Sequence, residues 1–346
     1  MKRFFCLLLA LLTLLPTLAL AAGNTPRYSA TAKISGPVYA KMDKESAQVG
    51  RVNDYSNIRV YAVYPDWIYV NSDGVKGYVP RHYLNPGSAL DKTTTPPWGV
   101  EVYRYVGTAG KDGAQILAAP EAGSDVLITL GEGARFSIIA IEDGWARLAY
   151  WRQYGYVDTN SLGELLPVCT DAYSGSDHLP IATFTTYYVT GSEEESVHGK
   201  EINIGVNCRY MDGDVLKAGA TLNYDEHYGS YTAAKGYTRG PVLIETGWGL
   251  GMGGGVCQVS STLYNVLLQL PGINILHART HGPSGAEYLP LDMDAAVGNP
   301  ERGINMIFKN EYDFDLRFEA QAQDGALYIA LYRVSGSKTL ADSEAE

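Results

Sequence analysis

The sequence predicts a multidomain protein in which two small all-β barrels precede an α+β domain that has one central helix after a glycine-rich loop. Three observations support this fold class. Short segments of alternating apolar and polar residues, separated by turn formers, fill residues 30–164. The layout of residues 30–84 recurs in residues 100–164. A glycine-rich stretch from Gly247 runs into a segment with the helical spacing of apolar residues. A length of 346 residues suits two or three domains.

Residues 1–21 have the pattern of a secretory signal peptide. A basic start is followed by an apolar run from Phe4 to Leu20 and by the small-residue site Ala19-Leu20-Ala21. Pro16 and the shortness of the run argue against a retained membrane anchor. We therefore expect the signal to be removed and the mature protein to be secreted, with no membrane segment after cleavage.

The net charge excludes some binding partners, and the cysteine count indicates a free thiol or an intermolecular bond. The formal net charge of −11 argues against binding to nucleic acid or to anionic lipid. Cys6 lies in the signal, so the mature chain keeps Cys169, Cys208 and Cys257. An odd number of cysteines in an exported protein implies a free thiol or an intermolecular bond. A Cys169–Cys208 disulfide would leave Cys257 free, and this pairing stays open.

The two predicted barrels share their marker residues at a constant offset. Residues 85–99 between them are rich in proline and threonine and are expected to form a linker, as are residues 165–182 after the second barrel. We interpret the tryptophan of each barrel as a core residue rather than a ligand contact. The matched positions are Val38 and Ile116, Val52 and Leu130, Val60 and Ile138, Trp67 and Trp145, and the triplets Gly77-Tyr78-Val79 and Gly155-Tyr156-Val157.

Residues 183–334 are predicted to form the α+β domain, and residues 335–346 a disordered tail. A strand is expected over residues 183–190, an extended segment over 216–224, and a short strand over 273–276. The helix is expected from Val259 to Leu270, with a polar face opposite its apolar one. The last strands alternate apolar and polar residues around a hairpin turn at Asp324-Gly325.

Cys257 is the candidate nucleophile. It follows a run of glycines and lies at the start of the predicted helix, where unpaired amides and the positive end of the helix dipole favour a thiolate. The same amides would stabilise an oxyanion formed by attack on a carbonyl. The alternative is an inert, packed cysteine, which is common in proteins.

Histidines and aspartates downstream of Cys257 supply a base and a group that orients it. His277 directly follows an apolar strand, whereas His281 lies in a loop, so we prefer His281 as the base, and Asp292 and Asp294 are the candidates for its partner. A metal site built from Cys257, His277 and His281 matches no common zinc spacing, so no metal and no cofactor are expected.

Two families resemble parts of this chain. Residues 30–84 and 100–164 resemble bacterial SH3-type domains, which in exported proteins commonly bind peptidoglycan peptides. The region from about residue 183 to 331 resembles the VanW family, named after an accessory protein of vancomycin-resistance clusters. The motifs that carry this second resemblance are GGGVCQVSSTLYN at residues 253–265, Arg279-Thr280-His281, Tyr288-Leu289-Pro290, Asp294-Ala295-Ala296-Val297 and Phe308-Lys309-Asn310. In place of the family's P-G-E-x-F-S-F-N segment, this chain has KAGATLNY at residues 217–224.

The resemblance implies a cell-wall function. Some members of the VanW family are linked to L,D-transpeptidation of peptidoglycan with the motif cysteine as nucleophile, which implies Cys257 here and peptidoglycan stem peptides as partners. Of Asp292 and Asp294, the resemblance implies Asp294 as the partner of His281. Two alternatives stay open: a cysteine endopeptidase or carboxypeptidase of the NlpC type, and a non-catalytic wall-binding protein linked to glycopeptide resistance. The residues expected to hold the oxyanion or the substrate are Gly254, Gly255, Val256, Gln258, Ser260, Ser261 and Arg279.

Overall fold

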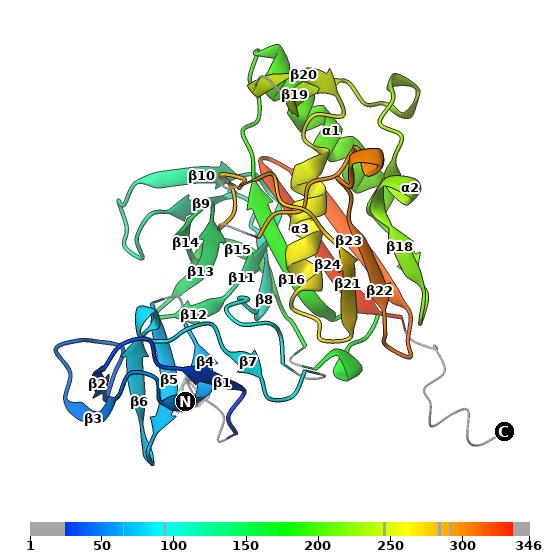
Figure 1. The fold of residues 1–346 in the computed structure, drawn as a ribbon. Coiled ribbons are helices and arrows are strands. Elements are labelled where there is room, and N and C mark those ends of the chain that lie inside the picture. The colour runs from blue at the N-terminus through cyan, green and yellow to red at the C-terminus, as the bar shows by residue number, and fades with distance from the viewer. Residues whose placement is uncertain are drawn as a thin grey trace, which may run out of the picture. The chain divides into compact units, whose positions relative to one another are not determined.

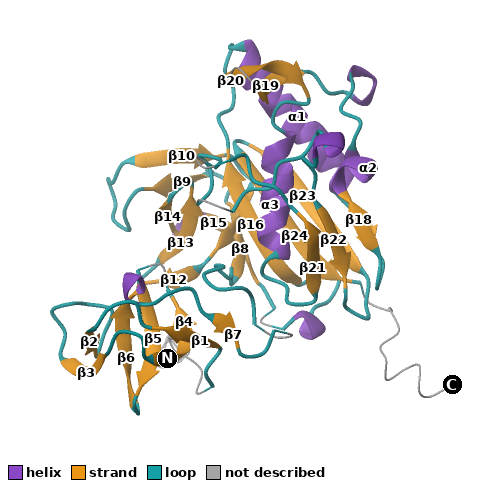
Figure 2. Cartoon of the chain, in the orientation of Figure 1, coloured by secondary structure: helices purple, strands orange, loops and turns teal. Residues whose placement is uncertain are grey.

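A computed structural model describes residues 25–334 except residues 65, 93–94, 170, 245–246, 283–284 and 291–292, and it leaves the side chains of residues 243, 244 and 248 undescribed. The predicted signal peptide and the predicted C-terminal tail lie outside the described residues. The chain divides into two compact units, Met1–Gly99 and Val100–Glu346. Most of the regular structure is β, with three α-helices among the described residues, all in the second unit (Figure 2).

The first unit contains a sheet of seven strands in the order β3-β2-β6-β5-β4-β1-β7. Alternate residues of these strands point inward, because successive side chains of a strand face opposite sides. Val38, Val60, Ile68 and Val79 are fully buried and form the centre of its core. The strands are β1 (Tyr28–Thr31), β2 (Gly36–Tyr39), β3 (Gln48–Val52), β4 (Asn57–Val63), β5 (Trp67–Ser72), β6 (Val75–Pro80) and β7 (Ser88–Ala89).

The second unit begins with a β-region made of two sheets. One has the order β10-β9-β14-β13-β12 and the other the order β11-β8-β15. The strands are β8 (Tyr105–Ala109), β9 (Ala114–Leu117), β10 (Val126–Leu130), β11 (Arg135–Ile138), β12 (Ala140–Glu142), β13 (Trp145–Tyr150), β14 (Gln153–Asp158) and β15 (Leu162–Pro167).

The structure confirms the internal repeat. Strands β2, β5 and β6 begin and end at positions that correspond, at the same offset, to those of β9, β13 and β14. The paired apolar positions Val38 and Ile116 are both fully buried. The interpretation of the tryptophans as core residues is wrong, because Trp67 and Trp145 are only half-buried and belong to neither apolar core.

The rest of the second unit combines sheets with helices (Figure 1). Its sheets have the orders β16-β24-β23-β17, β18-β22-β21 and β19-β20. The strands are β16 (Pro180–Tyr187), β17 (Val215–Leu216), β18 (Thr221–Asn223), β19 (Arg239–Ile244), β20 (Gly247–Met252), β21 (Ile273–His277), β22 (Ile307–Asn310), β23 (Leu316–Gln323) and β24 (Ala326–Arg333). The helices are α1 (Glu195–Met211), α2 (Tyr224–Tyr228) and α3 (Val256–Leu267).

Helix α3 lies on the face of the β16-β24-β23 sheet and also packs against α1 (Figure 1). Its apolar residues Val259, Leu263 and Val266 are completely buried in the main core. The expected polar face is buried too. Thr262 hydrogen-bonds to Thr186 of β16 at 2.8 Å, and Gln269 donates to the carbonyl of Thr183 at 2.9 Å. Thr262 and Gln269 therefore connect this polar side to strand β16 by hydrogen bonds.

Two local predictions need correction. The domain has more than one helix: residues 195–211, for which no helix was expected, form the long helix α1. Part of the expected glycine loop is strand β20, which pairs with β19 in an antiparallel hairpin, so only the turn at residues 253–255 separates it from α3. None of the described helices has the length and apolar character needed to cross a bilayer.

The β-region of residues 100–167 and the helical part share a core. Ser137 of β11 bonds through its amide to Thr185 at 2.9 Å and through its hydroxyl to Thr183 at 2.7 Å, and all three side chains are buried. Tyr103 packs edge-on against Phe184 with ring centres 5.2 Å apart. The expected linker 165–182 begins inside β15 and ends inside β16. The two parts therefore pack as one unit.

Candidate active site

Three glycines bring Cys257 to the start of α3. Gly255 is the residue before the helix and has φ 113°, a conformation that side chains with a Cβ rarely adopt. A Cβ on Gly254 would lie 2.2 Å from the carbonyl carbon of Gly240, so the β19-β20 hairpin approaches the loop directly. Cys257 is then the second residue of α3, where backbone amides have no partner inside the helix.

The amide of Cys257 is available at this helix start. The backbone N–H of Val256 donates to the carbonyl oxygen of Gly253 at 3.1 Å, and the backbone N–H of Gln258 donates to the carbonyl oxygen of Gly255 at 2.9 Å. Among the residues that the structure describes, the Cys257 amide has no acceptor. It therefore lies beside its own thiol as a donor for an oxyanion.

His281 and Asp294 form a tight pair in the same site. Asp294 Oδ2 accepts hydrogen bonds from His281 Nδ1 at 2.6 Å and from the His281 amide at 2.7 Å. The Asp294 side chain is completely buried, whereas that of His281 is 18% exposed. Burial would raise the pKa of Asp294, but the hydrogen bonds and charge of His281 lower it. Asp294 is thus an anion that fixes the orientation of the imidazole.

His281 also interacts with Cys257. Burial disfavours the imidazolium, but the hydrogen bond to Asp294 and the nearby Cys257 and Asp294 side chains raise the pKa of His281 to about 10. Because Nδ1 is hydrogen-bonded to Asp294, Nε2 is the ring nitrogen that remains for proton transfer. Among the described residues, the ring hydrogen bond of His281 goes to Asp294, and a hydrogen bond from the other ring nitrogen to a cysteine nucleophile often forms only in the complex with substrate.

Two backbone groups of Val297 contact the thiol of Cys257. Cys257 Sγ lies 3.4 Å from both the Val297 carbonyl oxygen and the Val297 nitrogen. Among the described residues, Cys169, Cys208 and Cys257 are all free thiols, so the structure has no Cys169–Cys208 disulfide. Cys257 is half-buried, whereas Cys208 is buried inside α1.

The side chains of His277 and Arg279 are hydrogen-bonded to backbone carbonyls rather than to Cys257. His277 Nε2 is bonded to the carbonyl oxygen of Gly303 at 2.8 Å. The exposed guanidinium of Arg279 donates to the carbonyl of Arg302 at 2.9 Å, so the structure does not place it at Cys257. The described residues hold no cluster of three His, Cys, Asp or Glu side chains suited to a metal ion.

Three polar residues of α3 position the site rather than face its opening. The side-chain amide of Gln258 donates to the hydroxyl of Thr186 and to the carbonyl oxygen of Tyr187, both in β16. The residue is only 1% exposed. Ser260 donates to the carbonyl of Ala295 at 2.6 Å, while Ser261 accepts from the Ala295 amide at 3.0 Å. These serines therefore fix the chain next to Asp294.

Several supporting residues have no signal in the sequence motif. Buried Asn203 of α1 donates to the carbonyls of Gly254 at 2.8 Å and of Thr238 at 3.0 Å, which ties the hairpin to the glycine turn. Asp225 of α2 accepts from the Gly298 amide at 2.9 Å and from the Tyr231 hydroxyl at 2.7 Å. It thereby holds the segment that carries Val297. Long-range contacts of this kind follow from the fold and leave no local pattern in the chain.

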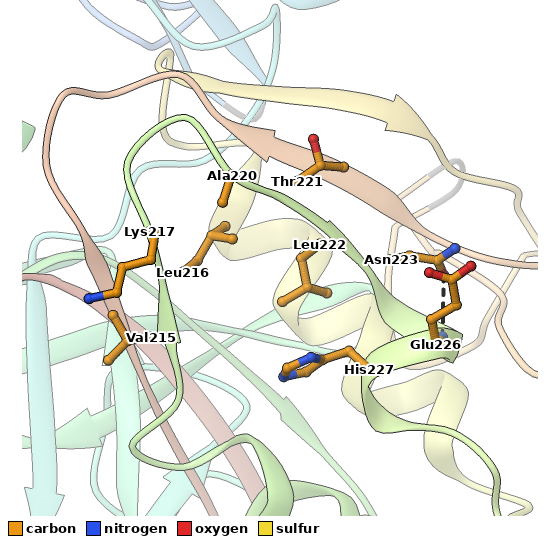
Figure 3. Close-up of a pocket in the computed structure, with 9 residues that line it drawn as sticks. All are labelled: Val215, Leu216, Lys217, Ala220, Thr221, Leu222, Asn223, Glu226 and His227. Atoms are coloured by element: carbon orange, nitrogen blue, oxygen red, sulfur yellow. Dashed lines mark hydrogen bonds between the residues drawn. The ribbon is translucent and has the colours of Figure 1, made fainter.

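The KAGATLNY segment of residues 217–224 belongs to a part of the domain other than the candidate active site. It contributes β18 and most of the lining of a hollow of about 300 Å³ beside β17 and α2 (Figure 3). None of the residues expected to act in catalysis lines this hollow. His227, at its wall, bonds to Asp214 at 2.6 Å, a second His–Asp pair without a cysteine.

Comparison with known proteins gives a family match for part of the chain. Residues 199–332 match the sequence profile of the family described as VanW like protein. Residues 199–332 form a VanW-like domain. The stretch contains the whole VanW-like site, from Asn203 to Val297, and it omits β16, on which α3 packs.

The chain also matches part of a curated protein. The chain is 30% identical over 154 residues to "Uncharacterized protein YoaR" of Bacillus subtilis (strain 168). The match covers 44% of this chain and 47% of that protein, so it spans about half the length of the relative.

Solved structures add only weak likenesses. An NlpC/P60 family protein from Bacillus cereus ATCC 10987 is 10% identical with a TM-score of 0.16, over 40% of this chain and 56% of that one. NlpC2 from Trichomonas vaginalis is 9% identical with a TM-score of 0.19, over 90% of this chain and 98% of that one. Likenesses at this level carry no argument about fold or function.

Proposed function

We propose that the protein is an exported, cell-wall-associated cysteine acyltransferase that acts on peptidoglycan stem peptides as an L,D-transpeptidase. One observation carries the chemistry: a half-buried thiol at a helix start, next to an imidazole that a buried carboxylate orients. Nucleophile, base and orienting group together form the arrangement that activates cysteine in acyl transfer. The choice of peptidoglycan rests on the VanW-like domain and the resemblance it confirms.

The first half-reaction forms a thioester. Cys257, as the thiolate, attacks the carbonyl carbon between an L-residue and a terminal D-residue of a stem peptide. The amide of Cys257 lies where it donates to the oxyanion of the tetrahedral intermediate. The C–N bond then breaks, and the imidazolium of His281 gives its proton to the departing amine of the D-residue.

The second half-reaction restores the enzyme. An amine of a second stem attacks the thioester carbonyl, and neutral His281 takes the proton that the amine loses. The C–S bond breaks, Cys257 leaves as thiolate, and a new amide crosslinks the two stems. With water in place of the amine, the same site performs hydrolysis, so the acceptor decides between transfer and the carboxypeptidase or endopeptidase alternative.

The test is incubation of the mature protein with a disaccharide tetrapeptide, followed by mass spectrometry. We expect crosslinked dimers or exchange of the terminal D-residue, and an acyl adduct on Cys257 after exposure to the stem peptide or a carbapenem. Cys257→Ala should lower the rate by about 10³-fold or more, since it removes the nucleophile. Cys169→Ala, which removes another half-buried free thiol, should keep it.

Other outcomes favour the other functions. Shortened stems without dimers indicate a hydrolase. Unchanged substrate despite measurable binding indicates a wall-binding protein. Full activity of Cys257→Ala would exclude the proposed chemistry.

A further inference from the structure

Lys200 of α1 lies beside the helix start that carries Cys257. A Cβ placed on Gly255 would lie 2.9 Å from Lys200 Cγ and 3.0 Å from the Lys200 carbonyl oxygen. The backbone of α1 and the root of this side chain therefore contact the turn directly before Val256 and Cys257. Neither the sequence motif nor the triad accounts for a lysine at this point.

The ammonium group of Lys200 extends toward the wall of the site. Its Nζ lies 5.3 Å from the centre of the Tyr288 ring. The phenol of Tyr288 interacts with the Ser261 side chain and with the charges of Cys257 and Asp294. One aromatic ring thus borders Lys200 as well as the catalytic pair, which locates the cation at the edge of the same site.

This cation has no close counter-ion in the part of the chain that the structure describes. The side chain is half-buried, and no described carboxylate lies within ion-pair distance of Nζ. Burial lowers the pKa of Lys200 to about 8, and the charge of Glu287 offsets only part of this effect. A partly dehydrated ammonium without a partner gains more from an incoming anion than an exposed one does.

We propose that Lys200 binds the free carboxylate of the leaving residue and so selects acyl donors that carry one. In a peptide, that carboxylate is separated from the scissile carbonyl carbon by only the nitrogen and the Cα of the last residue. A cation beside the nucleophile is therefore placed for it. This inference rests on the proposed function, and it adds which end of the donor the site recognises.

The test uses binding, so that it does not depend on turnover. In the mature Cys257→Ala protein, calorimetry compares a stem tetrapeptide that has a free C-terminal carboxylate with the same peptide as the C-terminal amide. We expect the acid to bind at least about tenfold more tightly. Lys200→Met should reduce this ratio to near one, and Lys200→Arg should keep most of it.

Controls separate recognition from folding. Lys76→Met removes a lysine that lies over a tyrosine ring in the first unit, with Nζ 4.6 Å from the centre of Tyr61, and should leave the ratio unchanged. Thermal unfolding of each variant checks that the fold is retained. A ratio that persists in Lys200→Met, or equal or absent binding of both peptides, overturns the proposal.

The outcome is distinguishable from failure of the reaction. Wild-type protein that forms the Cys257 adduct at equal rates from acid and amide contradicts the role of Lys200 and keeps the acyltransferase. Lys200-dependent binding with no adduct contradicts the acyltransferase and keeps the carboxylate site.

Discussion

At the scale of single residues, the site depends on how one carboxylate affects one imidazole. Asp294 is completely buried, and its Oδ2 accepts both the ring and the backbone N–H of His281. Its second oxygen, Oδ1, is buried and has no hydrogen-bond partner among the described residues. An anion held in this way stabilises the imidazolium, which explains a His281 pKa of about 10 despite burial. His281 is therefore protonated at neutral pH and is ready to donate a proton to the leaving amine.

Asp294→Asn should move the alkaline limit of activity to lower pH. In the wild type, the rate of adduct formation on Cys257 should fall as pH rises through about 10, where His281 loses its proton. Without the carboxylate, burial favours neutral imidazole, so the limit should drop by about one to two pH units. Stopped-flow or quenched mass spectrometry across pH 6 to 11 measures it. The matched control is Asp214→Asn in the His227 pair, and a limit unmoved by Asp294→Asn contradicts this account.

At the scale of elements, the strands were easier to predict than the helices. The β23–β24 hairpin has a plain alternating pattern, and its turn residues Asp324 and Gly325 have the expected positive φ of 47° and 84°. Helix α1 was missed because its buried side includes Gly199, Asn203 and Asn207, while Ile202 is exposed, so its polarity gives no apolar stripe.

The site residues that could be predicted were those with a local sequence signal, and those that act through long-range packing could not. Residue types were enough to propose Cys257 with His281, because the nucleophile needs a base, whereas Asp294 was selected by the resemblance to the VanW motif. Gln258 was misplaced, since a polar helix face that bonds a sheet looks the same in sequence as one that faces water. Asn203 acts on Gly254 only through the packing of α1, which no local pattern encodes.

Gly255→Ala tests whether the turn before α3 needs a glycine. Alanine at this position would have to adopt a φ near 113°, and its Cβ would contact Lys200. We therefore expect a loss of about 2–4 kcal/mol in the free energy of unfolding. Gly213→Ala is the control, because its φ is 82° with nothing within 4 Å, and should cost about 1–2 kcal/mol. Urea titrations measure both. Equal losses would show that the approach of α1 imposes no constraint on the turn.

At the scale of the whole molecule, the β-region of residues 100–167 supports the VanW-like domain. Arg152 donates to the carbonyls of Leu289 at 3.0 Å and Ala286 at 3.3 Å, on both sides of Tyr288. Tyr187 of β16 and Ala326 of β24 belong to the same core cluster as the β-region's own apolar residues. The second copy of the repeat is thus part of the scaffold of the site, whereas the first copy belongs to a separate unit.

This difference predicts how fragments of the chain behave. A fragment of residues 100–334 should fold and unfold in one cooperative transition, because it retains the whole shared core. A fragment of residues 168–334 should not fold, since it loses the partners of Thr183 and Thr185 and exposes apolar side chains of β16 and β24 that the β-region covers. Circular dichroism melting and limited proteolysis distinguish the two. The fragment 25–334 provides the control, since its second-unit transition should occur at the same temperature as that of 100–334. If 168–334 melted at that temperature too, the β-region would be a spacer and the site would need only the VanW-like domain with β16.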